Sequence, residues 1–223
     1  MDNYEIIEIG KTVEPEYCFK AVVSGNSGVG KTSILRYEVN NEFEQENLSQ
    51  SVLEHFSKNF QFGEKKIRIQ IWDTCGNEMY QQIMKSFYRS ALCIFLVFAI
   101  DDKNSFLNIN KWIEDIKIVN ENESPILVLI GNKKDKESER QVTKEEIENY
   151  CKENGIDLYF ETSAKTGEGI NELFKEVIKK LYTRFIEPLE IYSEKSFNST
   201  KNTEIGQCGI NSEKCKICDC LFY

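Results

Sequence analysis

Residues 25–32 read GNSGVGKT, a complete G-x-x-x-x-G-K-T phosphate-binding loop. The apolar run 17–24 before the loop predicts a buried strand, and Ile34 and Leu35 after it indicate a helix. Glycines let the backbone N–H groups turn toward phosphate oxygens, while Lys31 supplies positive charge and Thr32 offers a hydroxyl to Mg²⁺. We therefore expect a nucleotide to contact Gly25, Ser27, Gly28, Val29, Gly30, Lys31, Thr32 and Ser33.

A second motif indicates which base the bound nucleotide carries. Residues 131–135 read GNKKD and follow the apolar run 126–130, which places N-K-x-D at the carboxyl end of a predicted strand, where open α/β sheets bind ligands. The carboxylate of Asp135 can accept hydrogen bonds from N1–H and the N2 amine of guanine, and adenine has neither donor there. We expect Asn132 and the stem of Lys133 to join the loops and cover the ring.

Two further motifs complete the set. Residues 161–165 read ETSAK after the short apolar run 157–160. We expect the Ala164 N–H to donate to guanine O6, with Thr162 or Ser163 bracing the loop and Lys165 beside the nucleotide. Residues 73–76 read DTCG after the run 66–72. These would place the Asp73 carboxylate near Mg²⁺ through water and the Gly76 N–H against a γ-phosphate.

The periodicity alternates between strands and helices. The expected strands are 18–24, 56–62, 66–72, 93–100, 126–131 and 157–162. Residues 62–65 read FGEK and predict an antiparallel hairpin, whereas the other strands need crossover helices. One helical stripe runs from Phe106 to Ile116, a longer one ends at Pro188, and Thr143 begins a capping box. The pattern predicts a doubly wound α/β fold.

The chain resembles the Rab small GTPases of the Ras superfamily over roughly residues 15 to 187. Residues 66–74 are similar to the Rab strand that enters switch II, and 87–91 with 95–98 resemble the Y-Y-R-G-A segment and its following strand. The resemblance implies a P-loop NTPase small G domain with a six-stranded, mostly parallel sheet, one antiparallel edge strand and about five helices. It also implies a GTP/GDP switch with Mg²⁺ that recruits effectors to membranes in vesicle traffic. Its implied partners are exchange factors, activating proteins, effectors and prenyl-binding escort proteins, with the chain itself a monomer.

Switch II departs from that family. The family segment D-T-A-G-Q-E corresponds to DTCGNE, so Asn77 replaces the glutamine that orients the attacking water. Its side chain is shorter by about 1.3 Å, and small misplacements of a catalytic group are costly. We assign catalytic roles to Asn77, Lys31 and Gly76 and expect slow intrinsic hydrolysis, with a shifted backbone at Asn77 as the alternative.

Switch I departs further. The family segment S-T-I-G-V-D-F aligns with residues 50–56, QSVLEHF, which makes Ser51 the counterpart of the threonine that reaches Mg²⁺. Counting from Thr32 instead gives residue 50, so an insertion is needed and Ser49 is an alternative ligand. By the same count, Phe43 is at the family's position for stacking on guanine. The single histidine, His55, is interpreted as an ordinary strand residue.

Three aromatic residues correspond to positions that Rab effectors contact: Phe56, Trp72 and Phe87. Surface aromatic residues between the switches fit an interaction patch. The alternative is semi-buried packing.

The end of the chain carries a separate signal. Cys218 and Cys220 form the C-x-C arrangement on which Rab proteins carry two geranylgeranyl groups. A zinc site that includes Cys215 is the alternative, although no second ligand pair follows. We expect an N-terminal extension at 1–15, a GTP-binding domain at 16–188 and a flexible tail at 189–223. No run approaches the ~20 apolar residues of a membrane span, so we expect a cytoplasmic protein held peripherally on intracellular membranes by prenylation.

The net charge of the chain bears on whether nucleic acid is a partner. The net charge of −9 argues against nonspecific binding to nucleic acid. Two functions stay open: a slow GTP-hydrolysing switch, and a nucleotide-binding interaction module with negligible hydrolysis. An ATPase or kinase is disfavoured, because Asn132, Asp135 and Ala164 would have no role in it.

Overall fold

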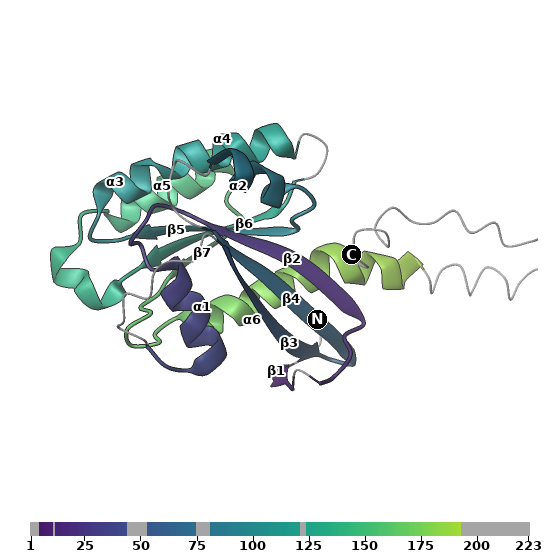
Figure 1. Ribbon diagram of the computed structural model, residues 1–223. Coiled ribbons are helices and arrows are strands. Elements are labelled where there is room, and N and C mark those ends of the chain that lie inside the picture. Colours follow the sequence, from purple (N-terminus) through teal and green to yellow (C-terminus); the bar gives the residue numbers. More distant parts are fainter. Residues whose placement is uncertain (1–4, 11, 44–52, 75–80, 121–123, 193–223) are drawn as a thin grey trace, which may run out of the picture.

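The computed structural model describes residues 5–10, 12–43, 53–74, 81–120 and 124–192. It contains one seven-stranded sheet in the order β1-β3-β4-β2-β5-β6-β7, with helices on both faces (Figure 1). In chain order the elements are β1 (Ile6–Ile9), β2 (Tyr17–Ser24), α1 (Lys31–Asn40), β3 (Leu53–Phe62), β4 (Lys65–Thr74), α2 (Gln81–Tyr88), β5 (Cys93–Ala99), α3 (Lys103–Leu107), α4 (Ile109–Val119), β6 (Ile126–Asn132), a 3₁₀ helix (Lys134–Glu139), α5 (Lys144–Asn154), β7 (Leu158–Glu161), α6 (Ile170–Leu181) and a π turn (Tyr182–Ile186).

The predicted α/β fold of a small G domain is confirmed. Strands β4, β2, β5, β6 and β7 are parallel to one another, and β3 joins β4 through the expected antiparallel hairpin. Helices α1 and α6 cover one face, and α2 to α5 cover the other (Figure 1). All seven residues of β5 are buried, because central parallel strands are covered on both faces.

The sheet has one strand more than the six expected. Strand β1 pairs antiparallel with β3 and lies at the edge, in the segment interpreted as an extension. Two side chains of β3 fasten it: Asn59 donates to the carbonyl oxygens of Gly10 and Val13 at 3.1 Å, and Lys58 pairs with Glu8 at 2.9 Å. The four residues of β1 carry too short a pattern to reveal this pairing, which depends on the free edge of β3.

The helices differ from prediction in two places. The stripe from Phe106 to Ile116 belongs to two helices, α3 and α4, which meet at Asn108. The prediction that the last helix ends at Pro188 is wrong, because helical structure continues to Tyr192. A π turn ends two residues before the proline, and the Glu187 N–H donates to the Tyr182 carbonyl oxygen. This wider turn changes the hydrogen-bond register where proline would otherwise crowd a carbonyl. The capping box at Thr143 is confirmed at the start of α5.

Candidate nucleotide-binding site

The phosphate-binding loop connects β2 to α1 at the carboxyl end of the parallel strands. Gly25 and Gly30 have φ values of 144° and 97°, a region that favours glycine. A Cβ at Gly25 would lie 2.1 Å from the Val97 oxygen, and one at Gly30 would lie 2.2 Å from the Asn132 amide nitrogen. Gly28 also has positive φ, but a Cβ there would meet nothing within 4 Å. The loop is thus closely packed below and open on the side of Gly28.

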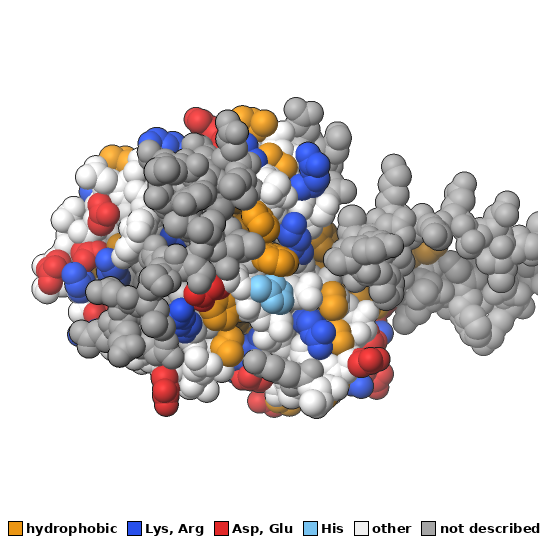
Figure 2. Space-filling view, in the orientation of Figure 1, with side chains coloured by type: hydrophobic (Ala, Val, Ile, Leu, Met, Phe, Trp, Pro, Cys, Tyr) orange, Lys and Arg blue, Asp and Glu red, His pale blue; other side chains and the backbone are white. Residues whose placement is uncertain are grey.

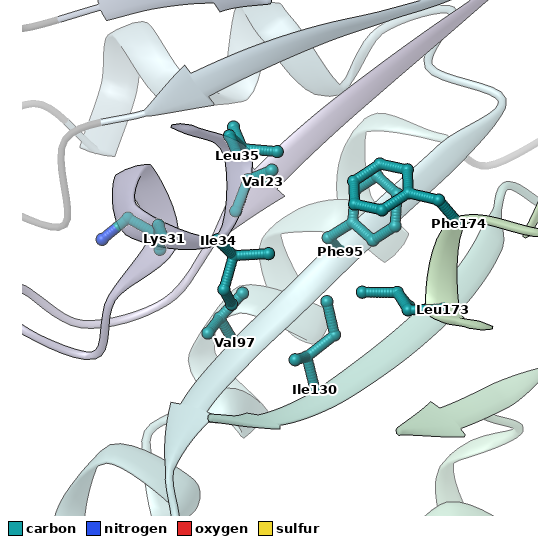
Figure 3. A pocket seen from close by; sticks show the side chains of 9 residues that line it. All are labelled: Val23, Lys31, Ile34, Leu35, Phe95, Val97, Ile130, Leu173 and Phe174. Carbon is teal, nitrogen blue, oxygen red and sulfur yellow. The ribbon is translucent and has the colours of Figure 1, made fainter. Parts of the chain in front are cut away.

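Lys31 and the start of α1 make this loop electropositive. The Lys31 amine donates to the carbonyl oxygens of Gly25 at 3.0 Å and Asn26 at 2.8 Å. No side chain caps the helix at Gly30, and its first turn holds no acidic residue, so its N–H groups favour an anion. Figure 3 shows the other end of this arrangement, where the stem of Lys31 borders a small apolar pocket and its amine points away from the pocket. The stem of Lys31 therefore rests on the apolar core, while its amine binds carbonyl oxygens of the loop.

Two of the three expected metal ligands, Thr32 and Asp73, are in direct contact. The Thr32 hydroxyl donates to Asp73 Oδ2. Asp73 is only 6% exposed, and its Oδ1 has no hydrogen-bond partner among the described residues. Burial raises the pKa of Asp73, while the Thr32 hydrogen bond and the positive charge of Lys31 lower it. A buried carboxylate oxygen beside a hydroxyl fits Mg²⁺, which usually takes one or two protein groups and completes its shell with phosphate and water.

A pocket of about 270 Å³ opens beside the loop. It is lined by Gly28, Gly30, Ser33, Phe43, Asn132, Lys133, Asp135, Lys136, Ala164 and Lys165. Phe43 is 40% exposed, a large aromatic side chain available for stacking. The Ser163 hydroxyl donates to Asp135 Oδ1 at 2.6 Å, which fixes the carboxylate in the pocket wall. The pocket thus combines an aromatic ring, a braced carboxylate and the phosphate loop, a combination that fits a guanine nucleotide.

Asn132 connects the three loops around this pocket. Its amide nitrogen donates to the Val29 carbonyl at 2.8 Å, and its Oδ1 accepts from the Thr162 hydroxyl and the Ala164 N–H, both at 3.2 Å. The Ala164 N–H, assigned to guanine O6 from the sequence, thus has a protein partner here. Asn132 is 2% exposed, so it acts between loops, inside the protein.

One pair beside the pocket was not singled out from the sequence. Lys136 lines the pocket and pairs with Asp101 Oδ2 at 2.7 Å, and the amine of Lys133 lies 3.8 Å from Asp101 Oδ1. Asp101 lies two residues after the end of β5, and acidic residues just past an apolar strand were the available signal. Asp101 therefore helps to hold Lys133 of the N-K-x-D motif and Lys136, which directly follows the motif.

Two of the three aromatic positions assigned to effectors lie together. The rings of Trp72 and Phe87 are 5.7 Å apart, and the His55 ring lies 4.7 Å from Trp72. Figure 2 shows the histidine on the surface beside hydrophobic side chains. Phe56 packs instead against the core beneath α1 and α6, because successive side chains of β3 face opposite sides of the sheet. The aromatic residues that lie together at the predicted effector positions are thus Trp72 and Phe87, with His55 beside Trp72.

The remaining predicted site residues lie outside the described ranges: Ser49, Ser51, Gly76, Asn77, Cys215, Cys218 and Cys220. No helix in the described part of the chain is long and apolar enough to cross a membrane.

Comparisons with known proteins agree with this geometry. The sequence model of the Ras family matches residues 20–183. The chain is 36% identical over 191 residues to Ras-related protein RABC1 of Arabidopsis thaliana, covering 85% of this chain and 87% of the relative. It is 35% identical over 175 residues to Rab-2B of Dictyostelium discoideum (77% and 86%) and 36% identical over 166 residues to Rab-9A of Rattus norvegicus (73% and 82%). The chain therefore belongs to the Ras family and, within it, to the Rab small GTPases.

Proposed function

We propose that this protein is a guanine-nucleotide switch that binds GTP and GDP with Mg²⁺ and recruits effectors in intracellular vesicle traffic. One observation carries the proposal: the braced carboxylate of Asp135 lines the same pocket as Gly28, Gly30 and Phe43. A carboxylate there matches the two donors on the edge of guanine, while the phosphate loop begins on the other side of the pocket. Exchange factors, activating proteins and escort proteins are the partners that such a switch requires.

The chemistry would use residues of the phosphate loop and switch II. Lys31 and the uncapped start of α1 bind the phosphates and stabilise the charge that develops during hydrolysis. Thr32 and Asp73, with Ser51 as the candidate from switch I, would hold Mg²⁺, which supplies charge neutralisation and phosphate orientation when bound. Asn77 and Gly76 would position water and the γ-phosphate. We propose that the short amide of Asn77 makes intrinsic hydrolysis slow.

Membrane attachment is the third part of the proposal. Cys218 and Cys220 would carry two isoprenoid groups, because one lipid without a basic patch binds membranes only marginally. Those groups would hold the protein on the cytosolic face of an intracellular membrane.

The experiment that tests the proposal measures binding and chemistry on the purified full-length chain. We expect copurified guanine nucleotide by liquid chromatography, tight GDP binding with no competition from ADP, and slow single-turnover hydrolysis of GTP labelled at the γ-phosphate. Equal affinity for ADP would contradict the proposal. Guanine binding without detectable hydrolysis would instead establish the alternative, a nucleotide-dependent interaction module.

A further inference from the structure

Two contacts lie side by side where α1 meets the β3–β4 hairpin. In the first, Thr32 donates to Asp73. In the second, the Arg36 guanidinium donates to both carboxylate oxygens of Glu54, at 3.2 and 3.3 Å. Thr32 and Arg36 are four residues apart on α1 and so lie on the same side of that helix.

The two acceptors are also neighbours. Glu54 and Asp73 are directly opposite each other in the antiparallel register of β3 and β4, so their side chains leave the sheet on the same face. The Arg36–Glu54 pair therefore lies directly beside the candidate metal ligands Thr32 and Asp73. Its side chains are 20% and 27% exposed, which leaves their charges less screened than those of an open surface pair.

The pair places charge of both signs close to the metal site. Glu54 adds a carboxylate beside Asp73, and Arg36 balances it. Glu54 aligns with a valine in the Rab segment of switch I. A chain with that valine has no carboxylate at this position to pair with Arg36, so the pair is particular to this chain. Glu54 is also the second residue of β3, so the pair holds the beginning of that strand against α1.

We propose that the Arg36–Glu54 pair positions and charge-balances the magnesium site, and thereby sets its affinity for Mg²⁺ and the rate of nucleotide release. The inference rests on the proposed function, because it requires a nucleotide held with Mg²⁺. Removing the positive charge of Arg36 would make the site more negative and favour Mg²⁺, and removing the negative charge of Glu54 would make it more positive and disfavour Mg²⁺. The two single substitutions are therefore expected to have opposite effects.

The test follows the release of a fluorescent GDP analogue from the full-length protein at a series of buffered free Mg²⁺ concentrations. For Arg36→Met we expect half-maximal slowing of release at roughly three- to tenfold less Mg²⁺ than in the wild type, and for Glu54→Gln at roughly three- to tenfold more. The double variant should return to within about twofold of the wild type.

A matched control pair lies at the opposite end of β4. Lys65 and Glu190 are 2.8 Å apart, with 29% and 31% exposure, and Lys65→Met and Glu190→Gln should leave the Mg²⁺ dependence unchanged. If the pair acted only as a structural brace, both single variants would shift the Mg²⁺ dependence in the same direction, and that result would overturn the inference. Shifts no larger than those of the control variants would also overturn it. If the wild type shows Mg²⁺-sensitive release and the variants match it, only this inference falls. If the wild type binds no GDP, the proposed function falls with it.

Discussion

The amide nitrogen of Asn132 donates to the carbonyl oxygen of Val29 at 2.8 Å, joining two loops that lie 103 residues apart in the chain. The same side chain accepts hydrogen bonds from Thr162 and Ala164. One buried amide therefore connects the phosphate-binding loop to the loops that carry the N-K-x-D and E-T-S-A-K motifs.

Asn132→Ala should weaken both the pocket and the fold. It leaves the Val29 carbonyl and the Ala164 N–H without these partners, and an unpaired buried polar group costs about 1–3 kcal/mol. We expect the free energy of unfolding to fall by about 2–4 kcal/mol and GDP affinity to fall at least roughly tenfold. Calorimetric titration and urea denaturation would measure both. The control is Asn154→Ala, whose amide bonds only within α5. Equal effects of the two substitutions would contradict the bridging role.

Asp135→Asn should change base preference. Ser163 holds Oδ1, so an asparagine at this position would present its amide nitrogen to the base if its oxygen kept the serine. A donor there opposes the N–H groups of guanine but suits the carbonyl of xanthine. We expect the preference to shift from GDP toward xanthosine diphosphate by roughly tenfold or more in competition binding. Ser163→Ala, which removes the brace and keeps the carboxylate, should bind GDP more weakly without changing the preference. Unchanged guanine affinity in Asp135→Asn would refute the assignment.

Asn77→Gln tests the reason proposed for slow hydrolysis. Restoring one methylene should bring the amide closer to the attacking water and raise the single-turnover rate several-fold, with GTP affinity unchanged within about twofold. Asn77→Ala should lower the rate. If the glutamine variant is no faster than the wild type, the water is positioned by another group or switch I limits the reaction.

Glu38 should make stability depend on pH. Glu38 is buried, and its carboxylate accepts from Lys58 at 2.7 Å. Burial raises the pKa of Glu38 to about 7, although the hydrogen bond and charge of Lys58 oppose the shift. Because the folded-state pKa is raised, the native state binds the proton more tightly than the unfolded chain does. This contribution to stability is complete below roughly pH 4 and is lost as pH rises through about 7.

The measurement is urea denaturation of the wild type and Glu38→Gln from pH 4.5 to 7.5. The stability of the wild type relative to the variant should fall by on the order of 2 kcal/mol over this range. The exposed Glu153→Gln is the control and should show no such trend. A constant difference between the wild type and Glu38→Gln would show that Lys58 keeps the buried carboxylate ionised throughout.

Replacing Cys218 and Cys220 by serine should release the protein from membranes. Each buried CH₂ of a lipid contributes about 0.8 kcal/mol, so two chains give stable anchoring and one gives reversible contact. We expect the double variant to fractionate as soluble with unchanged GDP binding, and either single variant to partition between fractions. Unmodified cysteines by mass spectrometry of the natively expressed protein would count against lipidation and favour the zinc alternative.

The sequence by itself determined the fold class and most of the candidate nucleotide pocket. Its motifs are local: the glycines of the phosphate loop, the carboxylate of Asp135 and the apolar run of β5 are each recognisable from neighbours along the chain. The carboxyl ends of parallel strands meet at one edge of the sheet. The position of each motif directly after a predicted strand was therefore enough to predict that these groups come together.

Tertiary structure alone decided the features that depend on distant partners. Strand β1 forms because β3 offers a free edge and because Asn59 of β3 binds the turn that follows β1. Neither feature can be recognised from residues 6–9 alone. Helical structure passes Pro188 because a π turn precedes it and Glu190 reaches Lys65. The Arg36–Glu54 pair needed the strand register to place it beside Asp73. Pairing energy of this kind depends on which surfaces meet, and a local pattern does not contain that information.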